Sequence, residues 1–322
     1  MPYYLGIDGG GSKTTCAVGD TISLLATSTA GPSNIVRVGE ARARESLHQA
    51  VRQACSAAGI SPRQIDRTCV GAAGAGRAEI STSVSQILAE ILPGQVTVVG
   101  DADIAFEAAF GSGPGVIVIA GTGSIAYGRD RQGRTARAGG WGFAISDEGS
   151  AHWIGRAALS AVLRSFDLGD GRRDEVGAGA APPLLRELMN AWKLDSLEAL
   201  VRTANFHGET AVVGSAPDFS AFFPVVLAAA SAGDDVAQRV LTAAAGELAQ
   251  LAAIVMHRLF PERTSSSAAV PMAMAGGVFR HAAMVREIFY NDVRKAHPRV
   301  ALNSEVVEPV HGALQMAWRA AS

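Results

Sequence analysis

The chain has 322 residues, about twice the usual length of one domain, so two lobes are expected. Hydrophobic residues make up 48% of it and charged residues 18%, and the formal net charge is -2 with no block of like charges. This composition indicates a globular protein with ample core. It argues against a basic nucleic-acid-binding surface and against a polybasic membrane patch.

The sequence shows no sign of export or membrane insertion. Patterned sequence begins directly at Tyr3, and no apolar run reaches the roughly 20 residues that span a bilayer. Cys16, Cys55 and Cys69 stand far apart and form no CxxC pair. We therefore expect a cytoplasmic protein with reduced, buried thiols and no structural zinc.

The first half of the chain alternates expected strands with expected helices. Apolar runs predict the strands, and apolar residues at helical spacing predict the helices. In chain order these are strands Tyr3–Asp8, Thr14–Val18 and Ile22–Ser28, helix Ala41–Ala58, strand Thr68–Ala73, helix Glu79–Leu92, strand Val96–Gly100 and helix Asp103–Phe110. This alternation predicts a mostly parallel sheet covered by helices.

The pattern breaks at the glycine-rich residues 111–115, which predicts a boundary or hinge. The opening order then recurs, and helices follow it. The expected elements are strands Gly115–Ala120, Ile125–Arg129 and Thr135–Ala138, helix Gly149–Phe166, helix Asp235–His257, strand Pro271–Ala275 and helix His311–Ala320, with surface loops at Asp167–Ala181 and Glu262–Ser267. We expect one duplicated plan, with an N-terminal lobe over residues 1–112, a C-terminal lobe over residues 113–310, and a terminal helix over residues 311–322 that packs back on the first lobe.

Two glycine-rich turns open the two halves. Asp8-Gly9-Gly10-Gly11-Ser12-Lys13-Thr14 follows the first strand, and Gly121-Thr122-Gly123-Ser124 follows the corresponding strand of the second half. Glycines let the backbone approach a phosphate, and successive N–H groups can form an anion cradle. The carboxylate of Asp8 would repel phosphate unless a cation intervenes, so Asp8 predicts a Mg²⁺ ion bound partly through water.

Neither turn is a common nucleotide motif. Ser12 interrupts the spacing of a P-loop, and the second turn lacks the helix that a dinucleotide fingerprint requires. A plain tight hairpin remains an equal alternative for either turn alone. The recurrence of such turns at the start of two similar halves favours a phosphate site.

Asp101 follows the buried run of residues 95–100 and precedes a helix. The carboxyl ends of strands in such a sheet face the ligand crevice, and phosphoryl transfer needs a carboxylate to orient and deprotonate the attacking hydroxyl. The alternative is an ordinary helix N-cap, for which Asp103 is the better candidate.

Four segments in this order resemble the N-acetylglucosamine kinase family, which belongs with the BadF/BadG-type ATPases in the actin-like ATPase and sugar-kinase superfamily. They are Asp8–Thr14, Gly121–Ser124, Gly139–Gly142 and Asp147–Ser150. The resemblance covers essentially the whole chain. It implies an α/β, two-lobed actin-like fold, a duplicated ribonuclease H-like ATPase fold with a central interlobe cleft, and a homodimer.

The resemblance also implies the binding residues. ATP would lie between the lobes on Gly9, Gly10, Gly11, Ser12, Lys13, Thr14, Gly121, Thr122 and Gly123, with Gly276 and Gly277 near the adenosine and Ser220 as a further contact. Asp101 would be the catalytic base and would touch the sugar, together with Asn34, Ser124, Gly140, Trp141, Gly142 and Asp147. Glu148 is expected to be structural. Ile125 departs from the family, because some members carry a polar residue there.

The expected reaction transfers the γ-phosphoryl group of Mg-ATP to the 6-hydroxyl of N-acetylglucosamine, and the expected partners are an amino sugar and ATP, without nucleic acid or membrane. Glucosamine is the closest alternative substrate; it needs a carboxylate near carbon 2, whereas Trp141 or Phe143 would suit an acetyl methyl group. Two other classes stay open. One is an ATPase that activates a radical dehydratase or reductase through a cysteine-held iron–sulfur cluster. The other is a non-enzymatic, nucleotide-dependent protein resembling actin.

Overall fold

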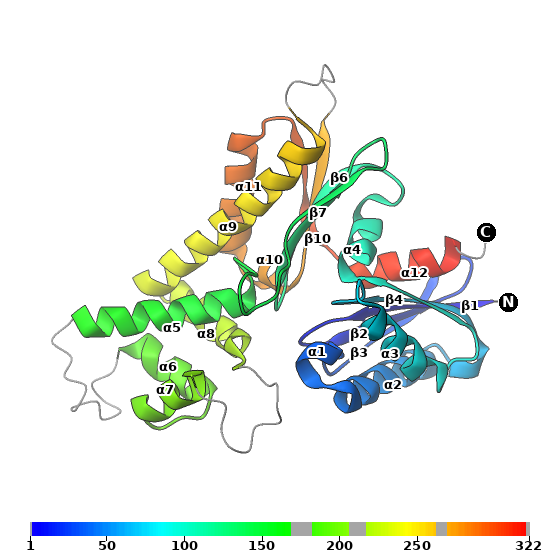
Figure 1. The fold of residues 1–322 in the computed structure, drawn as a ribbon, viewed down its shortest axis with the longest axis horizontal. Helices are drawn as coiled ribbons and strands as arrows, with labels where there is room; N and C mark the ends of the chain where they lie inside the picture. The colour runs from blue at the N-terminus through cyan, green and yellow to red at the C-terminus, as the bar shows by residue number, and fades with distance from the viewer. Residues whose placement is uncertain (1, 169–181, 206–216, 262–268, 320–322) are drawn as a thin grey trace.

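The computed structural model describes residues 2–168, 182–205, 217–261 and 269–319, which form two five-stranded sheets flanked by helices (Figure 1). The first sheet has the order β3-β2-β1-β4-β5, and the second has the order β10-β9-β6-β7-β8. The strands are β1 Tyr3–Gly9, β2 Thr14–Gly19, β3 Leu24–Ala30, β4 Ile65–Ala72, β5 Gln95–Gly100, β6 Gly115–Ala120, β7 Ser124–Arg129, β8 Thr135–Gly139, β9 Val270–Ala275 and β10 Val300–Val307.

The two sheets have the same topology. In each, the first three strands pair antiparallel, and the fourth and fifth pair parallel beside the first. The expected duplicated plan is thus confirmed. The expectation of mostly parallel sheets was wrong, because both glycine-rich turns and both following turns return the chain antiparallel to the preceding strand.

The helices account for most of the remaining described residues. They are α1 Ile35–Val38, α2 Glu40–Ala57, α3 Ala78–Ala89, α4 Asp101–Phe110, α5 Ala151–Leu168, α6 Pro183–Ala191, α7 Leu197–Asn205, α8 Phe223–Ser231, α9 Asp235–Leu259, α10 Gly277–His281, α11 Ala283–Ala296 and α12 Pro309–Arg319, with 3₁₀ turns η1 Pro62–Gln64 and η3 Phe219–Phe222. The sequence patterns did not predict α6, α7, α8 or β10. Of the expected surface loops, residues 169–181 and 262–267 lie outside the described residues, and Asp167 belongs to α5.

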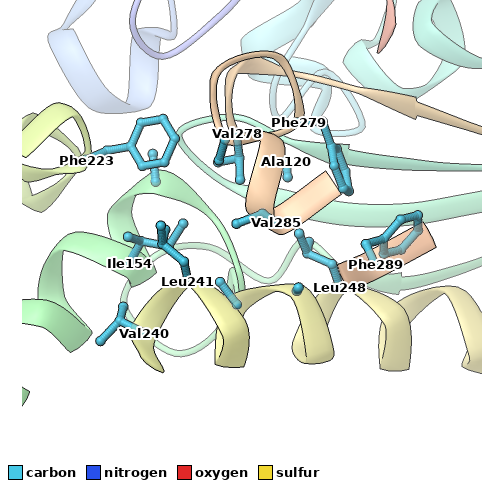
Figure 2. Packing of buried hydrophobic residues seen from close by; sticks show 14 of the residues in the cluster. Ala120, Ile154, Phe223, Val240, Leu241, Leu248, Val278, Phe279, Val285 and Phe289 are labelled. Carbon is cyan, nitrogen blue, oxygen red and sulfur yellow. The ribbon is translucent and has the colours of Figure 1, made fainter. Parts of the chain in front are cut away.

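Each sheet has its own hydrophobic core. In the first half, β1, β2 and β4 pack against α2 and α3. In the second half, α9 lies at the centre of a larger core with α5, α8, α10 and α11, which Figure 2 shows around Leu241 and Leu248. Although α9 is long and apolar enough to cross a membrane, 50% of its most apolar window is buried. Core packing therefore explains its composition.

Helices α4 and α12 connect the two halves. Ile104 of α4 and Leu314 of α12 pack on the first sheet, whereas Phe106 of α4 packs against Ile117 and Ala273 of the second sheet. The two helices approach so closely that a Cβ at Gly312 would lie 2.0 Å from the backbone oxygen of Ile104. The packing of α12 on β1 matches the expected return of the terminal helix, and the division of the chain at 112/113 stays a prediction, with one sheet on either side of it.

Candidate active site

The two glycine-rich turns, one from each half, meet. The first turn is closed by a hydrogen bond from Gly10 N–H to the Lys13 carbonyl, 3.0 Å, and the second by one from Gly121 N–H to the Gly123 carbonyl, 2.9 Å. Ser12 Oγ lies 2.7 Å from Thr122 Oγ1. The glycines and hydroxyls of both turns therefore lie together where the two halves meet, an arrangement that suits the oxygens of a phosphate chain.

The side chain of Thr14 takes no part in the contact between the two turns. It is fully buried, and its hydroxyl contacts the Gly31 carbonyl and Ser33 Oγ, each at 2.7 Å. The backbone N–H groups of Ser33 and Asn34 in turn donate to the Gly10 carbonyl, at 3.1 and 3.2 Å. Thr14 therefore holds the Asn34 segment against the first phosphate turn instead of presenting its own hydroxyl to a ligand.

Asp8 and Asp101 form the acidic part of the site. Burial and the negative charge of Asp101 raise the pKa of Asp8 to about 7, although Lys13 lowers it. Burial also raises the pKa of Asp101, against the opposing effect of backbone hydrogen bonds such as Ala102 N–H to Oδ1 at 2.9 Å. Buried carboxylates whose negative charge is disfavoured in this way provide the kind of oxygen donors that suit a divalent cation.

Asp101 is not the N-cap of α4. Gly100 takes that position, and its N–H donates to Asp103 Oδ2 at 3.0 Å, so Asp103 caps the helix from the first turn. The helix begins two residues earlier than predicted, at Asp101. Because Asp103 serves the helix end, the Asp101 carboxylate remains available at the edge of the sheet, where β5 ends.

Asp147 belongs to the second half and lies on the segment before α5. It is buried, and it adopts a left-handed φ of 65°. Its carboxylate accepts hydrogen bonds from the backbone N–H groups of Ser124 and Gly142, yet burial and the charges of Glu148 and Asp101 raise its pKa. A Cβ at Gly123 would lie 2.8 Å from Asp147 Oδ2, so the second phosphate turn and this carboxylate are packed together.

Ser124 and Glu148 hold this segment in place. Ser124 Oγ donates to the Glu148 carbonyl at 2.7 Å, and Ser146 Oγ donates to Glu148 Oε2 at 2.9 Å. The hydroxyl of Ser124, a predicted sugar ligand, is thus used within the chain. Asp147 is no N-cap either, because α5 begins at Ala151 and Ser150 Oγ accepts from Trp153 N–H at 3.2 Å.

The residues around Trp141 form an exposed loop. Gly139, Gly140 and Gly142 all have left-handed backbones, and Trp141 is 65% exposed with the Arg137 guanidinium 4.6 Å from its ring centroid. A Cβ at Gly140 would lie 2.9 Å from Ile125 Cδ1. Ile125, where the sequence is expected to depart from some family members, therefore packs against Gly140 and supports the loop.

Asn34 carries a buried amide oxygen without a hydrogen-bond partner among the described residues. It is the N-cap of α1, but its side chain makes no capping hydrogen bond. Leaving such an oxygen unpaired costs free energy, about 1–3 kcal/mol for a neutral group. A ligand hydroxyl is a natural donor for it.

Gly276 brings β9 to the second phosphate turn. Its φ is 98°, and a Cβ there would lie 2.4 Å from the Ala120 carbonyl oxygen. Gly277 then begins α10. The Gly276-Gly277 turn thus lies beside Gly121, and its contact with the adenosine stays a prediction.

The hydroxyl of Ser220, a predicted ATP contact, is surrounded by charged side chains of this protein. It contacts the Asp218 carboxylate, and Arg37 of α1 pairs with Asp218 and lies 3.3 Å from Ser220 Oγ. Beside this group the ring of His152 lies between Phe143 and Phe219, with centroids 5.1 and 5.3 Å away. Burial and the charges of Arg37 and Arg156 lower the pKa of His152 to about 4, so its imidazole is neutral. Sequence reasoning missed Arg37, Asp218 and His152, and no motif marks them.

The residues fit a magnesium ion with one protein carboxylate. Among the described residues no group of three histidine, cysteine or acidic side chains gathers as a metal cage. Mg²⁺ is usually bound through one or two carboxylates, with water and substrate phosphates supplying the other oxygens. Asp8, with its raised pKa beside the phosphate turn, suits that arrangement.

The three cysteines take no part in the site. Cys16, Cys55 and Cys69 are free and buried, on β2, α2 and β4 of the first half. Burial raises the pKa of Cys55 to about 11 and that of Cys69 to about 12. Neutral, buried thiols give no support to a cysteine-held cluster.

Comparison with known proteins finds relatives of this chain in sequence and in fold. It is 32% identical to the N-acetylmuramic acid/N-acetylglucosamine kinase of Clostridium acetobutylicum over 98% of each chain, and 29% identical to a glucosamine kinase of Vibrio cholerae over 82% of this chain and 83% of the relative. The fold matches the structure of a putative N-acetylglucosamine kinase from Chromobacterium violaceum, with a TM-score of 0.73, 22% identity and coverage of 98% of this chain and 99% of the other.

The fold is thus the actin-like ATPase fold, in agreement with the two sheets of equal topology. A family model for the BadF/BadG/BcrA/BcrD ATPases matches residues 5–317. This span contains both phosphate turns, Asp101 and Asp147. The chain therefore belongs to the BadF/BadG/BcrA/BcrD ATPase family.

Proposed function

We propose that the protein is an ATP-dependent hexosamine kinase that phosphorylates the 6-hydroxyl of N-acetylglucosamine. The observation that carries the proposal is the placement of Asp101 and Asp147, from opposite halves, near enough for the charge of Asp101 to raise the pKa of Asp147. One carboxylate at a strand end beside the phosphate turns suits a base, and a second, held by backbone N–H groups, suits vicinal sugar hydroxyls.

In the proposed mechanism Asp101 orients the 6-hydroxyl and accepts its proton as the oxygen attacks the γ-phosphorus. The bond between that phosphorus and the β-bridging oxygen breaks, and ADP leaves. The backbone N–H groups of the two glycine-rich turns that do not close the turns themselves, with the Ser12 and Thr122 hydroxyls, would hold the phosphate oxygens. Asp8 would hold a Mg²⁺ ion, which neutralises phosphate charge when bound.

One feature favours an acetylated substrate. Trp141 and Ile145 are exposed apolar side chains on the loop that carries the candidate sugar contacts, 65% and 80% exposed, and an acetyl methyl group can pack on such a surface.

Glucosamine remains the second candidate because Asp147 and Glu148 bring two carboxylates to the same segment. An ammonium group would lower the raised pKa of Asp147. The relative from Vibrio cholerae, named a glucosamine kinase, supports the same alternative. The sugar must therefore be decided by assay.

The test is ADP release, coupled to a spectroscopic readout, over N-acetylglucosamine, glucosamine, N-acetylmannosamine, N-acetylmuramic acid and glucose. We expect the highest kcat/KM with N-acetylglucosamine and, by phosphorus–proton coupling in NMR, a phosphate on carbon 6. Faster turnover of glucosamine would reassign the substrate. ADP release that no sugar accelerates would contradict a sugar kinase altogether.

A further inference from the structure

Arg37 spans the two halves of the molecule. It belongs to the one-turn helix α1 of the first half, and its guanidinium forms an ion pair with Asp218, which precedes η3 in the second half. The same guanidinium lies 3.3 Å from Ser220 Oγ. The Arg37 side chain is only 19% exposed, so the pair is shielded from water on one side.

On the first half, Arg37 is directly coupled to Asn34. The backbone N–H of Arg37 donates to the Asn34 carbonyl at 2.9 Å, within the single turn of α1. Asn34 is also the residue whose buried amide oxygen has no partner among the described residues. A fixed Arg37 side chain therefore restricts the position of the candidate sugar ligand.

On the second half, Asp218 is coupled to the second phosphate turn. The Asp218 carboxylate accepts from Ser220 N–H at 3.1 Å, which fixes it at the start of η3. The η3 turn packs on α5, where a Cβ at Gly155 would lie 1.9 Å from the Phe219 carbonyl oxygen. The first turn of α5 then donates from Ala151 N–H to the Gly121 carbonyl at 2.9 Å.

We propose that Arg37 and Asp218 are positioning residues whose ion pair ties Asn34 to the half that carries Asp147 and the second phosphate turn. The identity of the sugar rests on the proposed function, whereas the tie itself rests on the contacts alone. Because the pair joins the two halves beside Asn34, it holds the candidate sugar ligands of the two halves at one separation. Its loss should weaken sugar binding and leave the phosphate turns intact.

The tie is first tested without sugar, by amide hydrogen exchange followed by mass spectrometry. We expect Arg37→Gln and Asp218→Asn each to accelerate exchange in both residues 34–38 and residues 218–222, although these segments lie in different halves. Arg134→Gln is the matched control, because it removes an ion pair with Asp130 inside the β7–β8 turn. Equal exchange in the wild type and the two variants would overturn the proposal.

Steady-state kinetics then test whether loss of the ion pair weakens sugar binding. For each single variant we expect the KM for the sugar to rise about five- to tenfold, the range that a partly shielded ion pair supplies, with kcat and the KM for ATP changed less than about twofold. Arg37→Lys should restore most of the affinity. The double variant should be no worse than either single variant, because one interaction is lost in all three.

The outcomes separate the two proposals. A fall in kcat with an unchanged sugar KM would contradict a positioning role. Independent, additive effects of the two substitutions would contradict the pair. A wild-type protein that phosphorylates none of the sugars would refute the proposed function, and accelerated exchange in the variants would still support the tie.

Discussion

The hydroxyl oxygens of Ser12 and Thr122 lie 2.7 Å apart, so the two phosphate turns, 110 residues apart in sequence, contact each other directly. Each residue follows the first strand of its sheet, and the two sheets have the same topology. The contact therefore joins equivalent points of a duplicated fold. In the proposed kinase, an ATP phosphate chain between the turns would replace this hydrogen bond with bonds to its own oxygens.

Removing either hydroxyl should weaken ATP binding. We expect Ser12→Ala and Thr122→Val each to raise the KM for ATP about tenfold, because a hydrogen bond to a charged oxygen contributes about 1.5–3 kcal/mol, part of which water restores. Ser23→Ala, in the β2–β3 turn where Ser23 contacts Asp20, serves as the control. An unchanged ATP KM in both variants would show that the hydroxyls only contact each other.

Asp101 and Asp103 should separate chemistry from helix capping. Asp101→Asn is expected to lower kcat by about 10²- to 10⁴-fold, the usual contribution of a general base, while calorimetry detects nearly normal sugar affinity. Asp103→Ala should keep kcat within about twofold and cost about 1 kcal/mol of stability, because it removes the carboxylate that caps Gly100. Retained turnover in Asp101→Asn would remove this residue from the mechanism.

The pKa of Asp8 predicts how stability depends on pH. Burial and Asp101 raise it from 3.8 to about 7, so the folded protein binds this proton more tightly than the unfolded chain. The contribution of Asp8 to the free energy of unfolding is full below pH 3.8 and is lost as the pH rises through 7.

Asp8→Asn should therefore stabilise the Mg²⁺-free protein at pH 8 by roughly 1–3 kcal/mol and change it little at pH 4. Urea unfolding with EDTA at both values measures the difference, and added Mg²⁺ should narrow the gap at pH 8. A variant no more stable than the wild type at pH 8 would contradict the raised pKa.

Gly121 and Gly123 provide a matched pair in one turn. A Cβ at Gly121 would meet no atom within 4 Å, whereas one at Gly123 would press on the Asp147 carboxylate. Gly121→Ala should keep the melting temperature and raise the KM for ATP, because the methyl group enters the space for phosphate. Gly123→Ala should raise the KM for the sugar instead. The same kinetic change in both variants would show that Asp147 is not coupled to the turn.

The strands other than β10, and the two glycine-rich turns, could be predicted because their signals are local. Buried runs such as residues 115–120 and the glycines after them carry strong short-range signals. The repeated order of turn and strand also predicted the duplication. Helix ends were less accurate, since α4 begins at Asp101 and α5 at Ala151 because of capping by Asp103 and Ser150.

The contacts between the halves could not be predicted. Arg37 and Asp218 are 181 residues apart, and an arginine on a short helix resembles any exposed cation. Thr14 was expected to face ATP, yet its hydroxyl contacts Gly31 and Ser33, which strand alternation alone does not reveal. Side-chain direction in such turns depends on tertiary packing.

The position of α4 between the two sheets has a mechanical consequence. Its flank carries Phe106 against the second sheet, while Ile104 packs with α12 on the first sheet, so one helix is braced by both sheets. Asp101 is the first residue of that helix. The candidate base is therefore anchored to the cores of both halves at once, and not to a loop of either.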